Sequence, residues 1–186
     1  MSGDANESSR TGRVAVTGTP GTGKTTATEC LDHRVIHLND VVKSEGLTTG
    51  HDEVRDTAIV DVDAVEEWLA THAPTDAVVE SHLAHTFPAD RVVVLRAHPT
   101  TIEERLRDRG ESDDTARENA ESEALDVLLA EAVERHGEDA VYEVDTTDRT
   151  PESVAAEIDA VITGTREPSA ATVSFTDYLH QNIDDQ

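Results

Sequence analysis

Residues 18–25 read Gly-Thr-Pro-Gly-Thr-Gly-Lys-Thr and fit the pattern G-x-x-x-x-G-K-[ST]. A short apolar run at 14–16 precedes them, and a segment with helical character follows. Glycines let the backbone turn tightly and aim successive N–H groups at phosphate oxygens, while the start of a helix adds positive partial charge at the same place. In this order the stretch predicts a phosphate-binding loop, in which Lys24 reaches the β- and γ-phosphates and the Thr25 hydroxyl binds Mg²⁺.

The charge of the chain is extremely unbalanced. Among 186 residues, 40 are acidic and 15 are basic, which gives a formal net charge of -25. Only Lys24 and Lys43 are lysines, and no basic stripe suited to a nucleic-acid backbone is present. An acidic, hydrated surface is suited to concentrated salt, where a Debye length of about 3 Å at 1 M suppresses self-repulsion. We therefore expect a halophilic protein that makes no direct contact with nucleic acid.

Short runs rich in Val and Ile alternate along the chain with helical patterns. Buried parallel strands have this composition, and the alternation favours an α/β sheet covered on both faces. The predicted strands are 14–16, 35–38, 77–79, 92–95 and 140–144. The predicted helices are 64–72 with a capping-box-like opening at Asp63, 100–109 after Pro99, 115–136 before Gly137, and a last helix from Thr150-Pro151 to before Gly164.

The two ends of the chain lack such periodicity. We interpret 1–12 as a flexible leader, 13–164 as a single nucleotide-binding domain, and 165–186 as a C-terminal tail for which disorder is favoured over docking. The single cysteine, Cys30, is expected to be packed and to indicate a reducing compartment. Because no apolar run approaches the roughly 20 residues that span a bilayer, we expect a soluble, cytoplasmic protein.

Glu80 follows the third apolar run, where a parallel sheet presents side chains to the crevice beyond its strand ends. A carboxylate there complements Thr25 as a Mg²⁺ ligand, directly or through water, although a solvated acid at a strand end is the competing interpretation. His82 and His85 also follow this run, but a zinc site is disfavoured because no cysteine and no clear third ligand accompany them.

Four arginines surround a polar turn: Arg105, Arg107, Arg109 and Arg117. Phosphoryl transfer requires cations positioned around the transferring oxygens. Arg105 and Arg109 are four residues apart and share a helical face, so both are expected to point to the phosphate loop. Arg109 is the candidate for a catalytic or ATP-contacting role. The glycine-initiated loop that follows it is a candidate lid that excludes water.

A polar insertion lies between the second and third predicted strands. It contains Asn39-Asp40, Lys43 and Arg55. In kinases of small phosphorylated acceptors, a lobe at this point holds the second nucleotide, with Lys43 or Arg55 neutralising its phosphate; a surface ion pair is the alternative for either cation.

Together these residues resemble the small adenylate kinases of archaea and of the eukaryotic nucleus, a family linked to maturation of the small ribosomal subunit. The resemblance runs from about residue 13 to 162. It rests on the loop 18–26, on Asn39-Asp40, on the acid-x-His signature at 80–82, on Phe87-Pro88, on 94–96 and on 104–110.

The resemblance implies a three-layer P-loop NTPase fold with a five-stranded parallel sheet, a short monophosphate lobe at about 40–61 and a short lid at about 108–118. It implies ATP contacts from Gly21, Gly23, Lys24, Thr25, Thr26 and Arg109. Asp40 then belongs to the acceptor site, and His82 helps to position water. A ribosomal-protein partner and ATPase activity in subunit assembly are also implied.

Two departures from the family pattern bear on these expectations. Glu80-Ser81-His82 stands where eukaryotic members usually have Asp-Tyr-His, which moves the carboxylate farther from its backbone. Lys43 stands where an arginine often contacts the acceptor phosphate, and a point charge does not reproduce a bidentate fork.

The leading hypothesis is therefore an adenylate kinase that converts MgATP and AMP to two ADP, with other nucleoside monophosphates as further acceptors. Two alternatives stay open. One is an assembly factor whose ATP binding or hydrolysis gates attachment to a ribosomal protein; the other is a kinase for a different small acceptor.

Overall fold

The computed structural model describes residues 12–52 and 57–181. Five parallel strands form a central sheet in the order β2-β5-β1-β6-β7. Their bounds are β1 (Val14–Thr17), β2 (Val35–His37), β5 (Val78–Glu80), β6 (Arg91–Arg96) and β7 (Val141–Asp145). All five strands coincide with the predicted apolar runs, and the α/β architecture with a five-stranded parallel sheet is confirmed.

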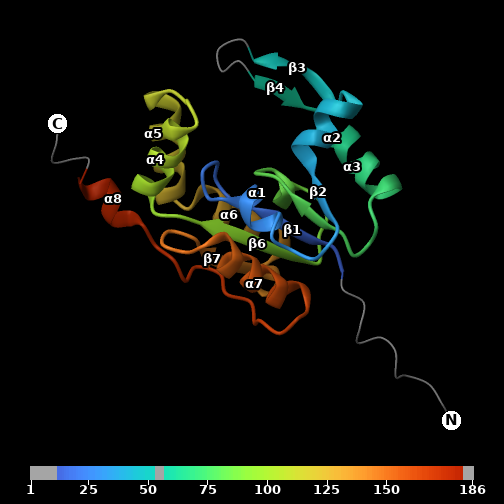
Figure 1. Ribbon diagram of the computed structural model, residues 1–186. Coiled ribbons are helices and arrows are strands. Elements are labelled where there is room, and N and C mark those ends of the chain that lie inside the picture. The colour runs from blue at the N-terminus through green and yellow to red at the C-terminus, as the bar shows by residue number, and fades with distance from the viewer. Residues whose placement is uncertain (1–11, 53–56, 182–186) are drawn as a thin grey trace.

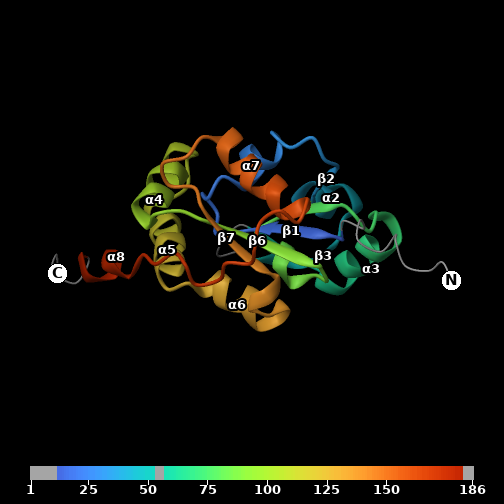
Figure 2. The ribbon, with the colours of Figure 1, turned by 90° about the horizontal axis from the view of Figure 1, so that it is seen from below.

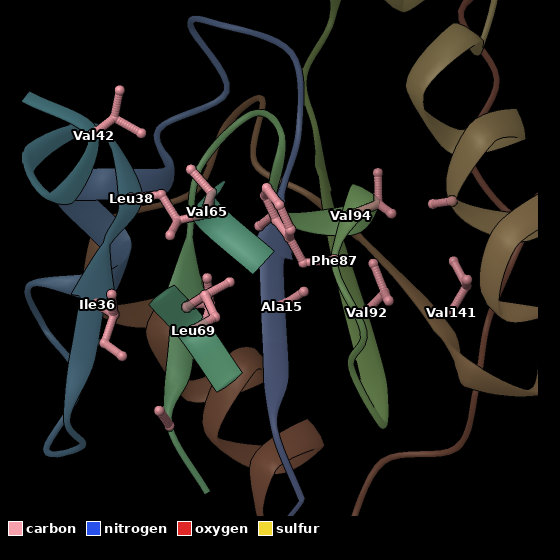
Figure 3. Packing of buried hydrophobic residues seen from close by; sticks show 14 of the residues in the cluster. Ala15, Ile36, Leu38, Val42, Val65, Leu69, Phe87, Val92, Val94 and Val141 are labelled. Atoms are coloured by element: carbon pink, nitrogen blue, oxygen red, sulfur yellow. The ribbon is translucent and has the colours of Figure 1, made fainter. Parts of the chain in front are cut away.

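The sheet lies between two layers of helices (Figure 2). Because side chains alternate along a strand, neighbouring residues enter opposite layers. Ala15 and Val92 pack with α3 (Val62–His72) and α6 (Val127–His136), as Figure 3 shows in part. On the other face, strand residues pack with α1 (Lys24–Thr28) and α7 (Pro151–Ile162). Near-continuous Val runs are therefore needed, since both faces of each strand are buried.

Two helix boundaries differ in detail from expectation. The α3 helix begins earlier than predicted, and its cap is Asp61 rather than Asp63: the Asp61 carboxylate accepts a hydrogen bond from Ala64 N at 3.1 Å. Asp63 lies within the first turn, where an acid is favourable to the helix dipole. The α7 helix has the predicted opening, with Thr150 accepting from Ser153 N and Pro151 in the first turn.

The predicted long helix over 115–136 is wrong, since it is two helices, α5 (Asp113–Ala124) and α6. Asp126 lies between them with a left-handed φ of 56°, which ends one helix and caps the next. As a consequence Leu125 is 61% exposed. The break has a structural reason: it turns the Asp126 carboxylate back onto Arg96, 2.5 Å away.

Two segments project from the sheet (Figure 1). One is the expected polar lobe, built from α2 (Leu38–Glu45) and an antiparallel pair, β3 (Thr48–Asp52) and β4 (Thr57–Val60). The other is a helical hairpin of α4 (Pro99–Asp108) and α5, whose packing centres on Ala97, Ile102, Leu106 and Ala116. Two short 3₁₀ turns, η1 (Ala84–Thr86) and η2 (Glu138–Ala140), complete the connections.

Residues 165–181 have a defined structure, and the expected disorder is wrong for this part of the tail. Ser169 forms a parallel bridge with Tyr142, and α8 (Thr176–Gln181) packs Tyr178 against Ala120 and Ala124. The apolar residues of the tail thus find a partner surface on α5, which composition alone does not reveal.

Three further expectations concern the remaining parts of the chain. The leader 1–12 lies outside the described residues except for Gly12. Cys30 is exposed instead of packed, because α1 ends at Thr28 and the chain turns toward the surface. Among residues 12–52 and 57–181, no helix combines the length and the apolar composition that crossing a bilayer requires.

Candidate active site

The phosphate loop joins β1 to α1 at the carboxyl end of the sheet. Gly18 lies so close to β6 that a Cβ there would stand 2.4 Å from Leu95 O, and Gly23 has a left-handed φ of 86° at the start of α1. Both positions therefore require glycine. The loop is also braced internally, because the Thr22 N–H and hydroxyl both donate to Thr19 O.

Lys24 lies across this loop. Its Nζ donates to Gly18 O at 2.8 Å and to Thr19 O at 3.2 Å. Burial is the main cause that lowers the pKa of Lys24 to about 8. The charge of Glu80 opposes this shift, and the charge of Arg109 adds to it. The ammonium is thus a partly desolvated charge held over the phosphate loop.

Glu80 connects the loop with the neighbouring strand ends. It is 4% exposed, and its two oxygens have different partners: Oε1 accepts from the Thr25 hydroxyl at 3.4 Å, and Oε2 lies 2.7 Å from His37 Nδ1. The solvated-acid interpretation of Glu80 is therefore wrong. Sequence reasoning missed His37, which ends β2 and reaches Glu80 only because β2 and β5 pair in the sheet.

The four arginines separate into distinct roles. Arg105 holds the loop, with Nη1 donating to Gly21 O at 3.1 Å and Nη2 to Thr146 O at 3.3 Å. Arg109 caps α4 and lies close enough to Lys24 to lower its pKa. Arg107 instead pairs with Glu103 and Asp113 at the surface, and Arg117 is exposed on α5. The expectation that Arg105 points to the phosphate loop is confirmed.

A cleft of about 290 Å³ opens beside the loop. Arg109, Arg105, Thr26 and Gly23 are among the residues that line it. The remaining lining residues are Thr22, Ala27, Thr146, Arg149, Pro151 and Val154. The cleft therefore combines guanidinium groups with an apolar wall, a surface suited to a flat, anionic ligand.

Sequence reasoning also missed Thr146 and Arg149. They follow β7, the last strand, whose carboxyl end lies at the same edge of the sheet as the phosphate loop. Their position one to four residues after an apolar strand was the available signal.

His82 and His85 face different surroundings. His82 is exposed, yet partial desolvation and then the charge of Lys24 lower its pKa. His85 is buried, with Nδ1 2.9 Å from the Thr17 hydroxyl and Nε2 3.2 Å from Glu131. Within the described part of the chain, no three His, Cys, Asp or Glu side chains gather as a metal-ligand set.

The buried His85 makes stability depend on pH. Burial lowers its pKa below 6.5 despite the opposing effect of Glu131. Between the lowered pKa of the folded state and the ordinary pKa of about 6.5 in the unfolded chain, the unfolded chain binds more protons. The free energy of unfolding therefore falls as pH drops below about 6.5 and is fully recovered above it. We expect His85→Asn to flatten this dependence by up to about 1 kcal/mol per pH unit.

Urea unfolding between pH 7.5 and 5 in molar KCl measures this slope. The matched control is His72→Asn, which removes an exposed imidazole and is expected to leave the slope unchanged. An equal slope in the wild type and in His85→Asn would rule out His85 as the source.

The predicted acceptor residues lie on the lobe. Asp40 and Lys43 are exposed on α2, and Arg55 lies outside the described residues. The start of α2 is tied to the active-site edge because Ser81 Oγ donates to Asn39 Oδ1 at 3.3 Å. The lobe thus begins beside the carboxyl end of β5, which is Glu80, and beside Ser81, which follows it.

Comparison with known proteins identifies relatives along most of the chain. The family model described as AAA domain matches residues 14–126. A protein named "Putative adenylate kinase" from Halobacterium salinarum is 60% identical over 170 residues, covering 90% of this chain and 99% of that protein. One of the same name from Natronomonas pharaonis is 58% identical over 169 residues, with the same coverage.

The chain belongs to this adenylate kinase family. A more distant member, from Pyrococcus furiosus, is 44% identical over 151 residues and covers 78% of this chain and 81% of its own length. The family places the chain among the phosphotransferases.

Solved structures support the fold of the family. Shikimate kinase from Acinetobacter baumannii in complex with shikimate matches with a TM-score of 0.59 at 17% identity, over 83% of this chain and 94% of that one. Shikimate kinase from Bacteroides thetaiotaomicron matches with a TM-score of 0.53 at 19% identity, over 81% and 97%. The common feature is the fold.

Proposed function

We propose that this enzyme is an adenylate kinase that transfers the γ-phosphoryl group of MgATP to AMP. The observation that carries the proposal is the convergence of Lys24, Arg109 and the Thr25–Glu80 pair at one phosphate loop beside a cleft. The name shared by relatives up to 60% identical supports the same assignment.

The residues present fit Mg²⁺. Thr25 and the buried Glu80 offer oxygen donors, and Mg²⁺ typically takes one or two protein oxygens and completes its shell with phosphates and water. His37 holds the second Glu80 oxygen, which fixes the carboxylate toward Thr25. When bound, the metal would neutralise charge on the β- and γ-phosphate oxygens.

The protein groups would act by positioning and by charge. The loop N–H groups and Lys24 would hold the β- and γ-phosphates, and Arg109 would stabilise charge that develops as the γ-phosphoryl leaves ADP and joins the AMP phosphate. Gly21, Gly23 and Thr26 would contact ATP, with the base in the cleft against Pro151 and Val154. The lid at about 108–118 would exclude water, which otherwise accepts the phosphoryl group.

The lobe formed by α2, β3 and β4 would bind the acceptor through Asp40, Lys43 and Arg55. A single ammonium at Lys43 favours moderate affinity, since it lacks the fork of an arginine. Acceptance of other nucleoside monophosphates follows if these contacts are made mainly to the phosphate.

ADP formation from MgATP with and without AMP, in molar KCl, tests the proposal. A kinase forms ADP rapidly only when AMP is present. Slow hydrolysis that ignores AMP but responds to a basic ribosomal protein would favour the alternative, an ATP-gated factor of small-subunit assembly in which His82 positions water. ATP binding with no turnover on any nucleoside monophosphate would favour a different small acceptor.

The acidic surface supports adaptation to high salt. With a net charge of -25, self-repulsion opposes the compact state unless salt screens it. As KCl falls from molar to millimolar, we expect the circular dichroism signal of the folded protein to be lost progressively and the unfolding temperature to fall. Both are expected to recover when salt is restored. A spectrum independent of KCl would contradict halophilic behaviour.

A further inference from the structure

A buried cluster of charges lies behind the phosphate loop. Arg96, at the carboxyl end of β6, is 1% exposed and donates to Glu123 Oε1 and Glu143 Oε1, each at 2.7 Å. Asp126 accepts a third hydrogen bond from its guanidinium. Burial opposes the Arg96 charge, but Glu123 and then Asp126 outweigh it and raise the pKa, so the arginine stays ionised.

One arm of the cluster reaches the phosphate loop. Glu123 Oε2 accepts from the Thr19 hydroxyl at 2.5 Å, and Thr19 O is the acceptor for Thr22 and for Lys24 Nζ. A second link passes through the Arg96 backbone: its carbonyl accepts from Thr146 N at 2.8 Å, and the Thr146 hydroxyl lies 2.9 Å from Thr22 O.

The other arm reaches the C-terminal segment. Glu143 Oε2 accepts from Thr172 N at 2.5 Å, from the Thr172 hydroxyl at 3.1 Å and from Val173 N at 3.4 Å. The Phe175 ring, 7% exposed, covers Arg96 with its centroid 5.5 Å from Cζ. Tyr178 then packs on Ala120 and Ala124, which flank Glu123 on α5.

Charge balance makes the two arms depend on each other. One guanidinium faces three carboxylates, so Arg96 alone does not compensate them. Donors from Thr19 and the Ala97 backbone N–H at one end, and from Thr172 and Val173 at the other, supply the remaining hydrogen bonds. Loss of either set leaves a buried carboxylate under-satisfied, which is costly and favours rearrangement of the whole cluster.

We propose that the C-terminal segment 169–178 is a positioning element for the phosphate loop, acting through Glu143, Arg96 and Glu123 on Thr19. The inference rests on the proposed function only in that MgATP is the ligand of the loop. Ordering of the tail and binding of MgATP are then coupled, and the coupling is reciprocal.

Hydrogen exchange of the wild-type protein in molar KCl tests the coupling without any substitution. Saturating MgATP is expected to slow exchange of the Thr172 and Val173 amides at least about fivefold, together with the loop amides. Protection of the loop with unchanged Thr172 and Val173 would overturn the inference and keep the function. If MgATP protects no loop amide, the proposed function itself fails.

A pair of tail variants supplies the second measurement. Phe175→Ala uncovers Arg96 and is expected to raise the Kd of MgATP at least about fivefold, with the Kd of AMP changed less than twofold, whereas Phe175→Leu keeps an apolar cover and most of the affinity. Ser174→Ala, at an exposed neighbour, is the matched control and should bind MgATP like the wild type.

Val65→Ala serves to separate a general loss of stability from a specific loss of MgATP affinity, because it weakens the core under α3 without touching the cluster. This variant is expected to unfold at lower temperature with an unchanged Kd for MgATP. A folded Phe175→Ala protein with wild-type affinity would overturn the inference; if it does not fold, the exchange measurement decides.

Discussion

Lys24→Ala is expected to lower kcat for ADP formation about 100- to 1,000-fold, or below detection, while leaving the fold intact. Lys24 is the one lysine that the phosphate loop contains, and its Nζ lies over the loop on Gly18 O and Thr19 O. We expect no neighbouring cation to replace it, because Arg105 donates to backbone carbonyls and Arg109 lies at the end of α4. Initial rates with saturating MgATP and AMP in molar KCl measure the loss.

The stability of the Lys24→Ala variant provides an independent test that Lys24 is placed for function. The pKa of Lys24 is lowered from 10.5 to about 8, chiefly by burial. Between those values the unfolded chain binds more protons, so at pH 7, below both values, the charged lysine lowers the free energy of unfolding by about 3 kcal/mol. Lys24→Ala is therefore expected to be at least as stable as the wild type, which a residue placed for structure would not be.

The matched control is Arg107→Ala. It also removes one positive charge, but from a surface pair with Glu103 and Asp113, and should leave kcat within about twofold because exposed pairs contribute little. A Lys24→Ala enzyme with near-normal turnover would contradict the assignment of the site. A similar loss in Arg107→Ala would indicate a general effect of net charge instead.

The sheet was predictable from sequence because burial on both faces demands uninterrupted Val-rich runs. The β3–β4 hairpin was not predictable by the same rule. Residues Thr48–Asp52 are mostly exposed and polar, so they show no apolar alternation, and their pairing with β4 is held by backbone bonds that any sequence can make. The described hairpin therefore replaces what the sequence indicated only as a polar turn.

Local signals also failed where a distant partner decides the structure. The break at Asp126 has neither Gly nor Pro; it is stabilised by Arg96, 30 residues away in the chain. The order of the tail likewise depends on Glu143 and on the α5 surface. Such pairings are set by topology and cannot be read from spacing along the chain.

Within the site, the loop motif and Glu80 were visible because each is local: one is a contiguous pattern, and the other is an acid at a strand end. His37, Glu123 and Glu143 were missed because their importance lies in contacts across strands and helices. A usable signal existed for Glu143, since a carboxylate within the apolar run 141–144 must be buried and hence partnered.

Replacing Arg96 has the largest expected effect on stability. Arg96→Met removes the one cation that Glu123 and Glu143 share, while both carboxylates stay buried at 3% and 1% exposure. Breaking one partner of a buried pair typically costs about 3–5 kcal/mol. We expect a loss of this size in the free energy of unfolding, measured by urea titration at constant molar KCl so that screening is unchanged.

Two further variants separate loss of charge from loss of shape. Arg96→Lys keeps the charge but not the planar fork that reaches three carboxylates, so an intermediate loss is expected. Arg96→Met combined with Glu143→Gln removes one uncompensated charge, and the amide still accepts from Thr172 N; we expect it to recover part of the stability lost in Arg96→Met alone. If the double variant is instead less stable by the sum of the two single losses, the carboxylates and Arg96 contribute independently and the cluster does not act as a unit.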